Sequence, residues 1–158
     1  MCDNIVIGKA FKIKHTNNRI ENNLIIDGAD EGVVILTNSP DCRVYRNILI
    51  NSIHVMKKGY TGYGDATDRV FVDNNIYWCD EACDGQQFIR ESILSGWDKN
   101  SLFTDPMFMD LEKGDLRLHP DSPAWQLGIR SINTSRIGLL DEPAFKRFSS
   151  VGFLKSAR

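Results

Sequence analysis

The chain has 158 residues, which suits one domain, and its 42% hydrophobic and 25% charged residues are ordinary values for a globular protein. Its formal net charge of −2 gives no basic field that would favour nucleic acid or an anionic membrane. No apolar run approaches the roughly 20 residues needed to cross a bilayer. We therefore expect neither nucleic acid nor a membrane as a partner.

A repeat of seven residues occurs three times, at 20–26, 44–50 and 72–78, with offsets of 24 and 28 residues. Each copy has an apolar residue, two mostly polar ones, an Asn and an apolar triplet. A fainter copy at 4–7 lies 19 residues before the first. A repeat of roughly 20–30 residues is typical of a solenoid, and short β-branched runs predict coils of β-strand rather than helix pairs.

The chain begins inside the weakest copy of this repeat, which suggests a piece of a longer protein. Residues 1–5 carry no charged and apolar export signal, and the sequence leaves the localisation open. The absence of an N-terminal capping helix predicts self-association as a homo-oligomer through the face formed by residues 1–20, because strand edges left unpaired there are templates for pairing.

The middle copy indicates how one coil is built. It contains three predicted strands separated by polar turns, at residues 24–26, 33–36 and 43–45. Three strands and three turns describe a triangular coil, and stacked coils would pair each strand in parallel with its counterparts about 4.8 Å away.

The recurring amides are Asn4, Asn23, Asn47 and Asn75. Asn is common in turns, but turn preference alone does not place it at one phase in four units, always before an apolar triplet. We therefore predict a ladder of stacked side chains at one corner, where Asn also tolerates left-handed backbone.

The coil that begins at Asn47 has a longer connection than the others. After a predicted strand at 53–56, about twelve residues at 57–68 replace a five-residue turn. Long loops on a rigid scaffold commonly carry function.

The repeat stops at Cys79, and a helix is predicted to begin after Asp84, which has a capping partner at Gln87. Its predicted apolar face consists of Phe88, Ile89, Ile93, Leu94 and Trp97. Short strands at 107–109 and 116–118, joined by a turn at 112–115, follow. A short helix is then predicted from Ser122 with Pro123 in its first turn and Gly128 after its end.

Three carboxylates in this part, Asp105, Asp110 and Asp115, are predicted to have turn and capping roles rather than catalytic ones. The tail at 141–158 carries aromatic and basic residues and is predicted to pack along the coil or against a second copy. Cys79 and Cys83 lack the second pair or nearby His of a zinc site, so we expect thiols packed as small apolar groups.

The ordered motifs of the second half resemble the C-terminal part of right-handed parallel β-helix repeat proteins of the pectate-lyase-like superfamily. The matching segments are residues 96–101, 105–110, 114–118, 121–124, 127–129 and 132–139. The nearest resemblance is to large bacterial β-helix glycoside hydrolases, of which this chain matches only the last coils. The resemblance implies a carbohydrate substrate and a parent family that is usually exported.

The predicted fold is an all-β solenoid, a short right-handed parallel β-helix of about three to four coils with a C-terminal cap containing a helix and short strands. We expect a single domain over 1–158, with coils at 1–78, the cap at 79–140 and the tail beyond.

The resemblance implies that substrate lies in a groove over one parallel sheet, near residues 33–36 and 53–56. The candidate catalytic residues there are Asp30, Glu31, His54, Lys57 and Asp65, and the candidate substrate-binding residues are Lys58, Tyr60 and Tyr63. Asp27 and Asp68 would lie within reach. Each group also has a purely structural interpretation. Asp27, Asp30 and Glu31 are common turn residues, His54 would point outward from its strand, and Lys57 and Lys58 would lie at a solvated edge.

Two chemistries fit the candidate residues. A glycosidase needs two carboxyl groups, which Asp30 or Glu31 facing Asp65 would supply. A polysaccharide lyase needs a base such as Lys57 or Lys58 beside a neutralised uronate, with calcium as a possible cofactor. Tyr60 and Tyr63 would stack on sugar rings. The alternative function is a non-catalytic β-helix fragment that binds carbohydrate or self-assembles.

Overall fold

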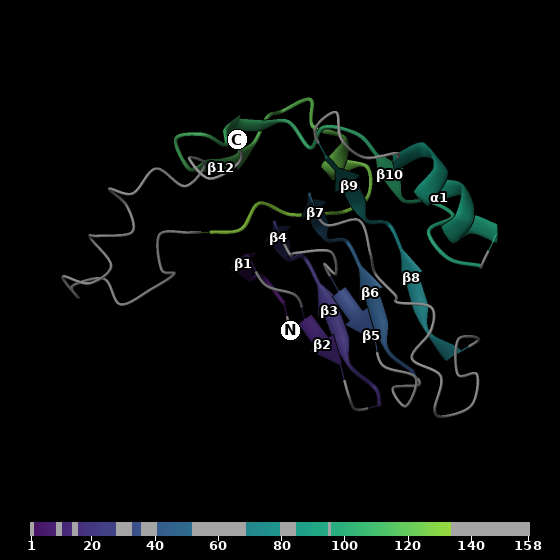
Figure 1. Ribbon diagram of the computed structural model, residues 1–158. Coiled ribbons are helices and arrows are strands. Elements are labelled where there is room, and N and C mark those ends of the chain that lie inside the picture. Colours follow the sequence, from purple (N-terminus) through teal and green to yellow (C-terminus); the bar gives the residue numbers. More distant parts are fainter. Residues whose placement is uncertain are drawn as a thin grey trace.

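The computed structural model describes residues 2–8, 11–13, 16–27, 33–35, 41–51, 69–79, 85–94 and 96–133 (Figure 1). These residues form mostly parallel β-strands in stacked sheets with buried asparagines, an arrangement compatible with a β-helix. The strands of the first half are β1 (Ile5–Ile7), β2 (Phe11–Ile13), β3 (Arg19–Glu21), β4 (Leu24–Ile26), β5 (Val33–Ile35), β6 (Arg43–Tyr45), β7 (Ile48–Ile50), β8 (Phe71–Asp73) and β9 (Ile76–Trp78).

The largest sheet has the order β1-β4-β7-β9-β10, where β10 spans Leu102–Phe103. All of its pairs are parallel, and Leu24, Ile48 and Ile76 share one register position. The offsets of 24 and 28 residues in the sequence repeat therefore equal the offsets between paired strands, and the weak copy at 4–7 pairs as expected. This part of the sequence prediction is confirmed.

Two smaller parallel sheets are also present among the described residues: β3-β6-β8 and β2-β5. The strand predicted at 33–36 is present as Val33–Ile35 and pairs with β2 in parallel. The strand predicted at 53–56 lies outside the described residues.

The predicted asparagine ladder is confirmed by its hydrogen bonds. The side-chain amides of Asn4, Asn23 and Asn47 donate to the Oδ1 atoms of Asn23, Asn47 and Asn75 respectively, at 2.9–3.0 Å. Each backbone N–H donates to the same oxygen at 3.0–3.1 Å. Asn23, Asn47 and Asn75 are at most 1% exposed, so the ladder satisfies amides that would otherwise be buried without partners.

A different set of groups ends the ladder. The backbone N–H of Asn75 donates to Ser101 Oγ at 2.9 Å, and Ser101 Oγ donates to Asp98 Oδ1 at 2.6 Å. Asp98 is 1% exposed and also accepts hydrogen bonds from Tyr77 and Ser92. Burial and the Asp98 carboxylate raise the pKa of Tyr77 well above its ordinary value, so Tyr77 remains a neutral donor.

One detail of the ladder differs from expectation. The left-handed backbone belongs to the residue before each ladder amide, with φ of 55° at Asp3, 53° at Asn22, 56° at Arg46 and 56° at Asn74. The corner consists of two residues with different roles. The first has the left-handed backbone that reverses the chain, and the second directs its side-chain amide along the stack. Arg46 shows that the surrounding bonds hold this conformation even without an Asx side chain.

The five-stranded sheet separates two apolar clusters. The inner cluster contains Ile25, Leu49 and Tyr77 from one face of this sheet, together with residues of the neighbouring sheets. The outer cluster contains residues of the opposite face, among them Leu24, Ile48 and Ile76, packed against the C-terminal part of the chain. Burial on both sides explains why the triplets of the repeat are apolar at all three positions.

The C-terminal part supplies this outer layer. Strands β11 (Phe108–Asp110) and β12 (Asp115–Leu118) pair antiparallel, as the turn between them predicted. The short helix predicted from Ser122 is a 3-10 helix, η3 (Pro123–Trp125), and Ser122 caps it by accepting from the N–H of Ala124 at 3.2 Å. Leu118, Ala124 and Ile129 are buried against the outer face of the five-stranded sheet.

The predicted helix is present as α1 (Gly85–Leu94), but its predicted apolar face is only partly correct. Ile89 and Trp97 pack against the inner cluster, whereas Ile93 is 42% and Leu94 88% exposed. The chain turns at Gly96, where φ is 90°, so Trp97 rather than the last helical turn reaches the cluster. Asp84 lies outside the described residues, and a cap over 79–140 stays a prediction.

The three carboxylates assigned to turns have the predicted local roles. Asp105 accepts from the N–H of Met107 at 2.7 Å, Asp110 binds Lys113, and Asp115 binds Arg117. The hydrogen bond from the Arg117 side chain lowers the pKa of Asp115 to about 2.

The cysteine prediction is wrong in one respect. Cys79 is disulfide-bonded rather than a packed thiol, while Cys42 is a buried thiol and Cys2 an exposed one. The sequence argument failed because the chain has too few cysteines for a disulfide scaffold, and that composition says nothing about a single bridge.

Candidate functional site

The catalytic and substrate-binding residues predicted from the sequence all lie outside the described residues. They are Asp30, Glu31, His54, Lys57, Lys58, Tyr60, Tyr63 and Asp65, together with Asp68. Of the surrounding candidates, only Asp27 is described, and its exposed side chain accepts from the Asn51 amide at 2.9 Å. Asp27 therefore has a structural partner in the next coil.

The described residues do fix where these candidate segments leave the scaffold. β4 and β7 are neighbouring parallel strands with Ile26 opposite Ile50. Both strands end in a left-handed turn, with φ of 49° at Asp27 and 50° at Asn51, and the N–H of Asp27 donates to the carbonyl of Ile50 at 3.0 Å. Two candidate segments thus start side by side, at the carboxyl ends of these neighbouring strands. One carries Asp30 and Glu31, and the other carries His54 to Asp65.

A second feature is the exposed face of the β3-β6-β8 sheet, which we call the arginine–aromatic face. It consists of Arg19, Glu21, Arg43, Tyr45, Arg46 and Phe71. The central residue of each strand points inward, since Ile20, Val44 and Val72 are buried in the inner cluster. The flanking residues therefore form two rows across the outer surface, one of Arg19, Arg43 and Phe71 and one of Glu21, Tyr45 and Asp73.

Glu21 organises the charges of this face. Its carboxylate forms ion pairs with Arg19 and, at 3.2 Å, with Arg46, although its side chain is only 7% exposed. Burial alone would raise the pKa of Glu21, but the hydrogen bonds and positive charge of the two arginines outweigh it and hold that pKa below its ordinary value. The carboxylate is therefore held as an anion between two guanidinium groups.

Tyr45 lies at the centre of the same face. The guanidinium carbons of Arg19 and Arg46 lie 5.4 and 5.6 Å from its ring centroid, and the Phe71 ring meets it edge to face at 6.2 Å. Phe71 is 48% exposed, which leaves much of an aromatic ring open to solvent. Burial, followed by the Glu21 charge, raises the pKa of Tyr45, so its hydroxyl stays protonated at neutral pH.

Asp73 closes one end of the second row. It accepts hydrogen bonds from the backbone N–H and the side-chain amide of Asn100 at 2.7 and 2.6 Å. These bonds tie the chain after α1 to β8, and they leave Asp73 buried rather than open to a ligand.

Sequence reasoning missed this face, although its pattern was visible. Arg19 and Arg43 occupy the same phase of the repeat, and each strand alternates outward, inward and outward side chains. The polar positions of these strands carry no motif of their own, in contrast to the asparagine corner and the long loop.

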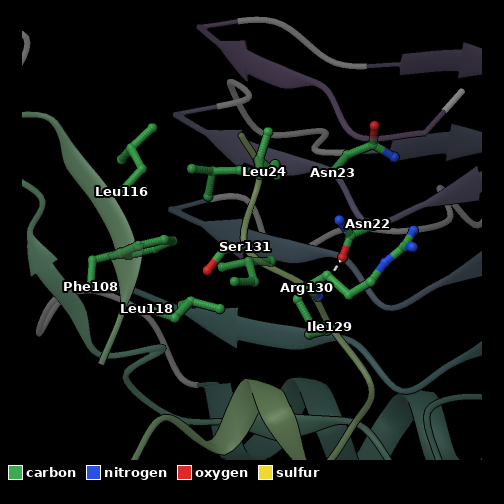
Figure 2. Close-up of a pocket in the computed structure, with 11 residues that line it drawn as sticks. Asn22, Asn23, Leu24, Phe108, Leu116, Leu118, Ile129, Arg130 and Ser131 are labelled. Carbon is green, nitrogen blue, oxygen red and sulfur yellow. Dashed lines mark hydrogen bonds between the residues drawn. The ribbon is translucent and has the colours of Figure 1, made fainter. Parts of the chain in front are cut away.

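A small pocket lies where the outer layer meets the five-stranded sheet (Figure 2). Phe108, Leu116 and Leu118 line one side, and Leu24 lies opposite, with the backbone N–H of Arg130 donating to Asn22 Oδ1 at 2.7 Å. The pocket has room for about one water molecule and is lined mostly by apolar atoms, so it is a packing gap rather than a ligand site.

Within the described ranges, no group of three or more His, Cys, Asp or Glu side chains is placed to hold a metal ion. No helix in the same part of the chain is long and apolar enough to span a bilayer.

The chain was compared with known proteins at three levels. No protein-family model matches it, and neither the curated proteins nor the solved structures contain a match. Function is therefore inferred from the arrangement of the described strands and from the motifs of the sequence.

Proposed function

We propose that this chain is a right-handed parallel β-helix of the pectate-lyase-like type that acts on or binds carbohydrate, as the C-terminal part of a polysaccharide-degrading glycosidase or lyase. The observation that supports this most directly is the common edge from which the two candidate segments leave β4 and β7. Loops that start from adjacent parallel strands of a rigid scaffold can bring their side chains to one ligand.

The chemistry follows from the residues of those two segments. In a glycosidase, Asp30 or Glu31 would act with Asp65 as the pair of carboxyl groups on either side of the glycosidic bond. In a lyase, Lys57 would remove the proton next to the carboxylate of a uronate, and the glycosidic C–O bond at the neighbouring carbon would break as a C=C bond forms. Lys58 or calcium would neutralise that carboxylate. Tyr60 and Tyr63 would hold the sugar rings, and His54 is a further candidate base.

The test is a panel of plant and bacterial polysaccharides, measured with and without calcium for both binding and turnover. New reducing ends indicate a hydrolase, and unsaturated ends detected by ultraviolet absorbance indicate a lyase. If the enzyme proposal holds, Asp30→Asn or Glu31→Gln abolishes turnover, while the exposed carboxylate variant Glu112→Gln leaves it unchanged.

The binding proposal uses a separate variant pair. The double change Tyr60→Ala and Tyr63→Ala should weaken binding to the polysaccharide that the panel identifies without a change in melting temperature, whereas Trp125→Ala, at a 42% exposed aromatic on the outer layer, should not. Binding without turnover favours the non-catalytic module. A panel with neither binding nor turnover would contradict both versions of the carbohydrate proposal.

A second candidate function is self-assembly, favoured by the position of β1 at an edge of the five-stranded sheet with Ile7 40% exposed. Edge strands are templates for pairing with another chain. Light scattering over increasing protein concentration should show a homo-oligomer, which Ile7→Lys should dissociate. A strictly monomeric species at high concentration would exclude this candidate.

A further inference from the structure

We infer that the arginine–aromatic face on the β3-β6-β8 sheet is a binding surface for an acidic glycan, one that carries carboxylate or sulfate groups. It lies on a different sheet from β4 and β7, at whose ends the candidate segments begin, so it goes beyond the proposed function. The surface is built entirely from described strands of the scaffold.

The first argument is the placement of positive charge. Arg19 and Arg43 are register neighbours on adjacent parallel strands, about 4.8 Å apart at the backbone. Like charges in such positions repel each other. Only Arg19 is relieved by Glu21, while Arg43 forms no ion pair with any described residue. An anionic ligand would supply a partner that no described residue provides for Arg43.

The second argument is the net charge of the face. Three guanidinium groups, from Arg19, Arg43 and Arg46, outnumber the two carboxylates of the same sheet: Glu21, which pairs with two of them, and buried Asp73, which binds Asn100. The nearby Arg69 is neutralised by Asp41, which binds it through two hydrogen bonds. A surplus of positive charge thus occurs locally in a chain whose formal net charge is −2, which favours a local anionic contact over a long-range field for nucleic acid.

The aromatic rings of the face favour a sugar chain over an acidic peptide. The face combines its guanidinium groups with the half-buried ring of Tyr45 and the exposed ring of Phe71. Guanidinium groups bind carboxylate or sulfate oxygens in pairs, and open aromatic faces can pack on the apolar faces of sugar rings. A peptide rich in carboxylates would use the charges but would gain little from Phe71.

Preorganisation is the fourth argument. The guanidinium groups of Arg19 and Arg46 lie against the Tyr45 ring, a contact that does not depend on the Glu21 charge, so their side chains are already ordered before a ligand arrives. Inward-facing Val44 and Val72 fix the strands beneath them in the inner cluster.

The experiment measures binding of the full chain to four probes at low and high salt: a polyuronate, a sulfated glycosaminoglycan, a neutral β-glucan and polyglutamate. Both acidic glycans should bind more tightly than polyglutamate, with affinity falling as salt rises because the contacts are charged and exposed. The relative affinity of the two glycans identifies carboxylate or sulfate as the preferred group.

Three variants test the residues. Arg43→Gln should weaken binding about tenfold and Phe71→Ala several-fold, as expected for a lost charge-assisted contact and a lost aromatic contact. Glu21→Gln should strengthen binding, because it frees Arg19 and Arg46 while keeping the side-chain shape. A purely structural role for Glu21 would not increase affinity.

The matched control is Arg117→Gln on β12, which removes the same charge from the outer layer that covers a different sheet. Equal effects of Arg43→Gln and Arg117→Gln would overturn the inference, and so would polyglutamate binding as tightly as the glycans. Melting temperatures confirm that each variant is folded, and Arg43→Gln should leave it unchanged because that side chain is exposed. The Tyr60 and Tyr63 double variant separates the two proposals, since it should leave this face intact.

Discussion

Asn47 shows how much of the scaffold one side chain can hold. Its amide donates to the carbonyls of Ile20 and Tyr45 at 3.1 Å and to Asn75 Oδ1 at 3.0 Å. Its own Oδ1 accepts two bonds from Asn23. Three copies of the repeat therefore meet at a single residue that is fully buried.

The change Asn47→Ala should destabilise the protein by about 3 kcal/mol or more, because each buried group left without a partner costs about 1–3 kcal/mol. Urea denaturation would measure this loss. Asn51→Gly is the matched control: that side-chain amide is exposed and bonds only to Asp27 among the described residues, and glycine tolerates the left-handed backbone of φ 50°, so a change within about 1 kcal/mol is expected. Equal losses for the two variants would contradict a ladder that supports the fold.

Glu21 predicts a dependence of stability on pH. Its pKa is lower in the folded protein than in the unfolded chain, so the stabilisation is present above the unfolded value of about 4.5. It is lost as the pH falls through the folded value, when Arg19 and Arg46 lose their anionic partner. Thermal melting between neutral and acidic pH should show a steeper fall for the natural chain than for Glu21→Gln, and parallel curves would contradict this assignment.

The ladder was predictable at this scale because four amides share one phase of the repeat. The left-handed position was not, because Asn22 and Asn74 stand directly before Asn23 and Asn75 and offer the same side-chain chemistry. Only Asp3 and Arg46, which differ in type, show that the first residue of each corner reverses the chain.

At the scale of elements, the outer layer depends on β11, β12 and the chain that follows them. Leu118 is 7% exposed and packs in the outer cluster, whereas Met109 of the same hairpin is 50% exposed. The hairpin therefore has one buried and one open face, which gives a matched pair of positions for a test.

Leu118→Ala should destabilise the protein by about 2–5 kcal/mol, the usual range for a large-to-small change in a core. Met109→Ala should change stability by no more than about 0.5 kcal/mol, as is usual at the surface. Urea denaturation, analysed with the same m-value for the natural chain and the two variants, would measure both changes in the free energy of unfolding. A small effect at Leu118 would mean that the outer layer is not part of the cooperative unit.

The existence of these elements was predictable, but their packing was less so. Turn residues and Pro positions locate β11, β12 and η3 because such signals are local in the chain. The face against which they pack depends on contacts between distant residues. One clue was available: apolar triplets such as 48–50 indicate a strand buried on both faces, which requires an outer layer.

Over the whole molecule, the parallel sheets predict a gradient of local stability. β7 lies between β4 and β9 in the five-stranded sheet, while β1 is at its edge. Amides of Ile48–Ile50 should therefore exchange with solvent much more slowly than those of Ile5–Ile7. Hydrogen exchange read by NMR would test this, and equal rates in the two strands would contradict the order of the sheet.

The pairing of the described strands agrees with the sequence prediction, because equivalent positions of a sequence repeat are the positions that pair in neighbouring strands. The predicted site could not be tested in the same way, because all its residues fall outside the described ranges. The arginine–aromatic face is the opposite case: its residues were available in the sequence, but their common surface becomes evident only when β3, β6 and β8 are placed side by side (Figure 1).

The hydrogen bond from the N–H of Arg130 to Asn22 joins residues 108 positions apart, far beyond the spacing of neighbouring coils. During synthesis, the early strands can stack as soon as they leave the ribosome, but the residues that cover Leu24 and Ile48, such as Leu118 and Ile129, are translated about 70 to 100 positions later. Until then, these apolar side chains are exposed to solvent on the outer face of the five-stranded sheet. Chaperone demand and misassembly should therefore concentrate in that interval of biogenesis.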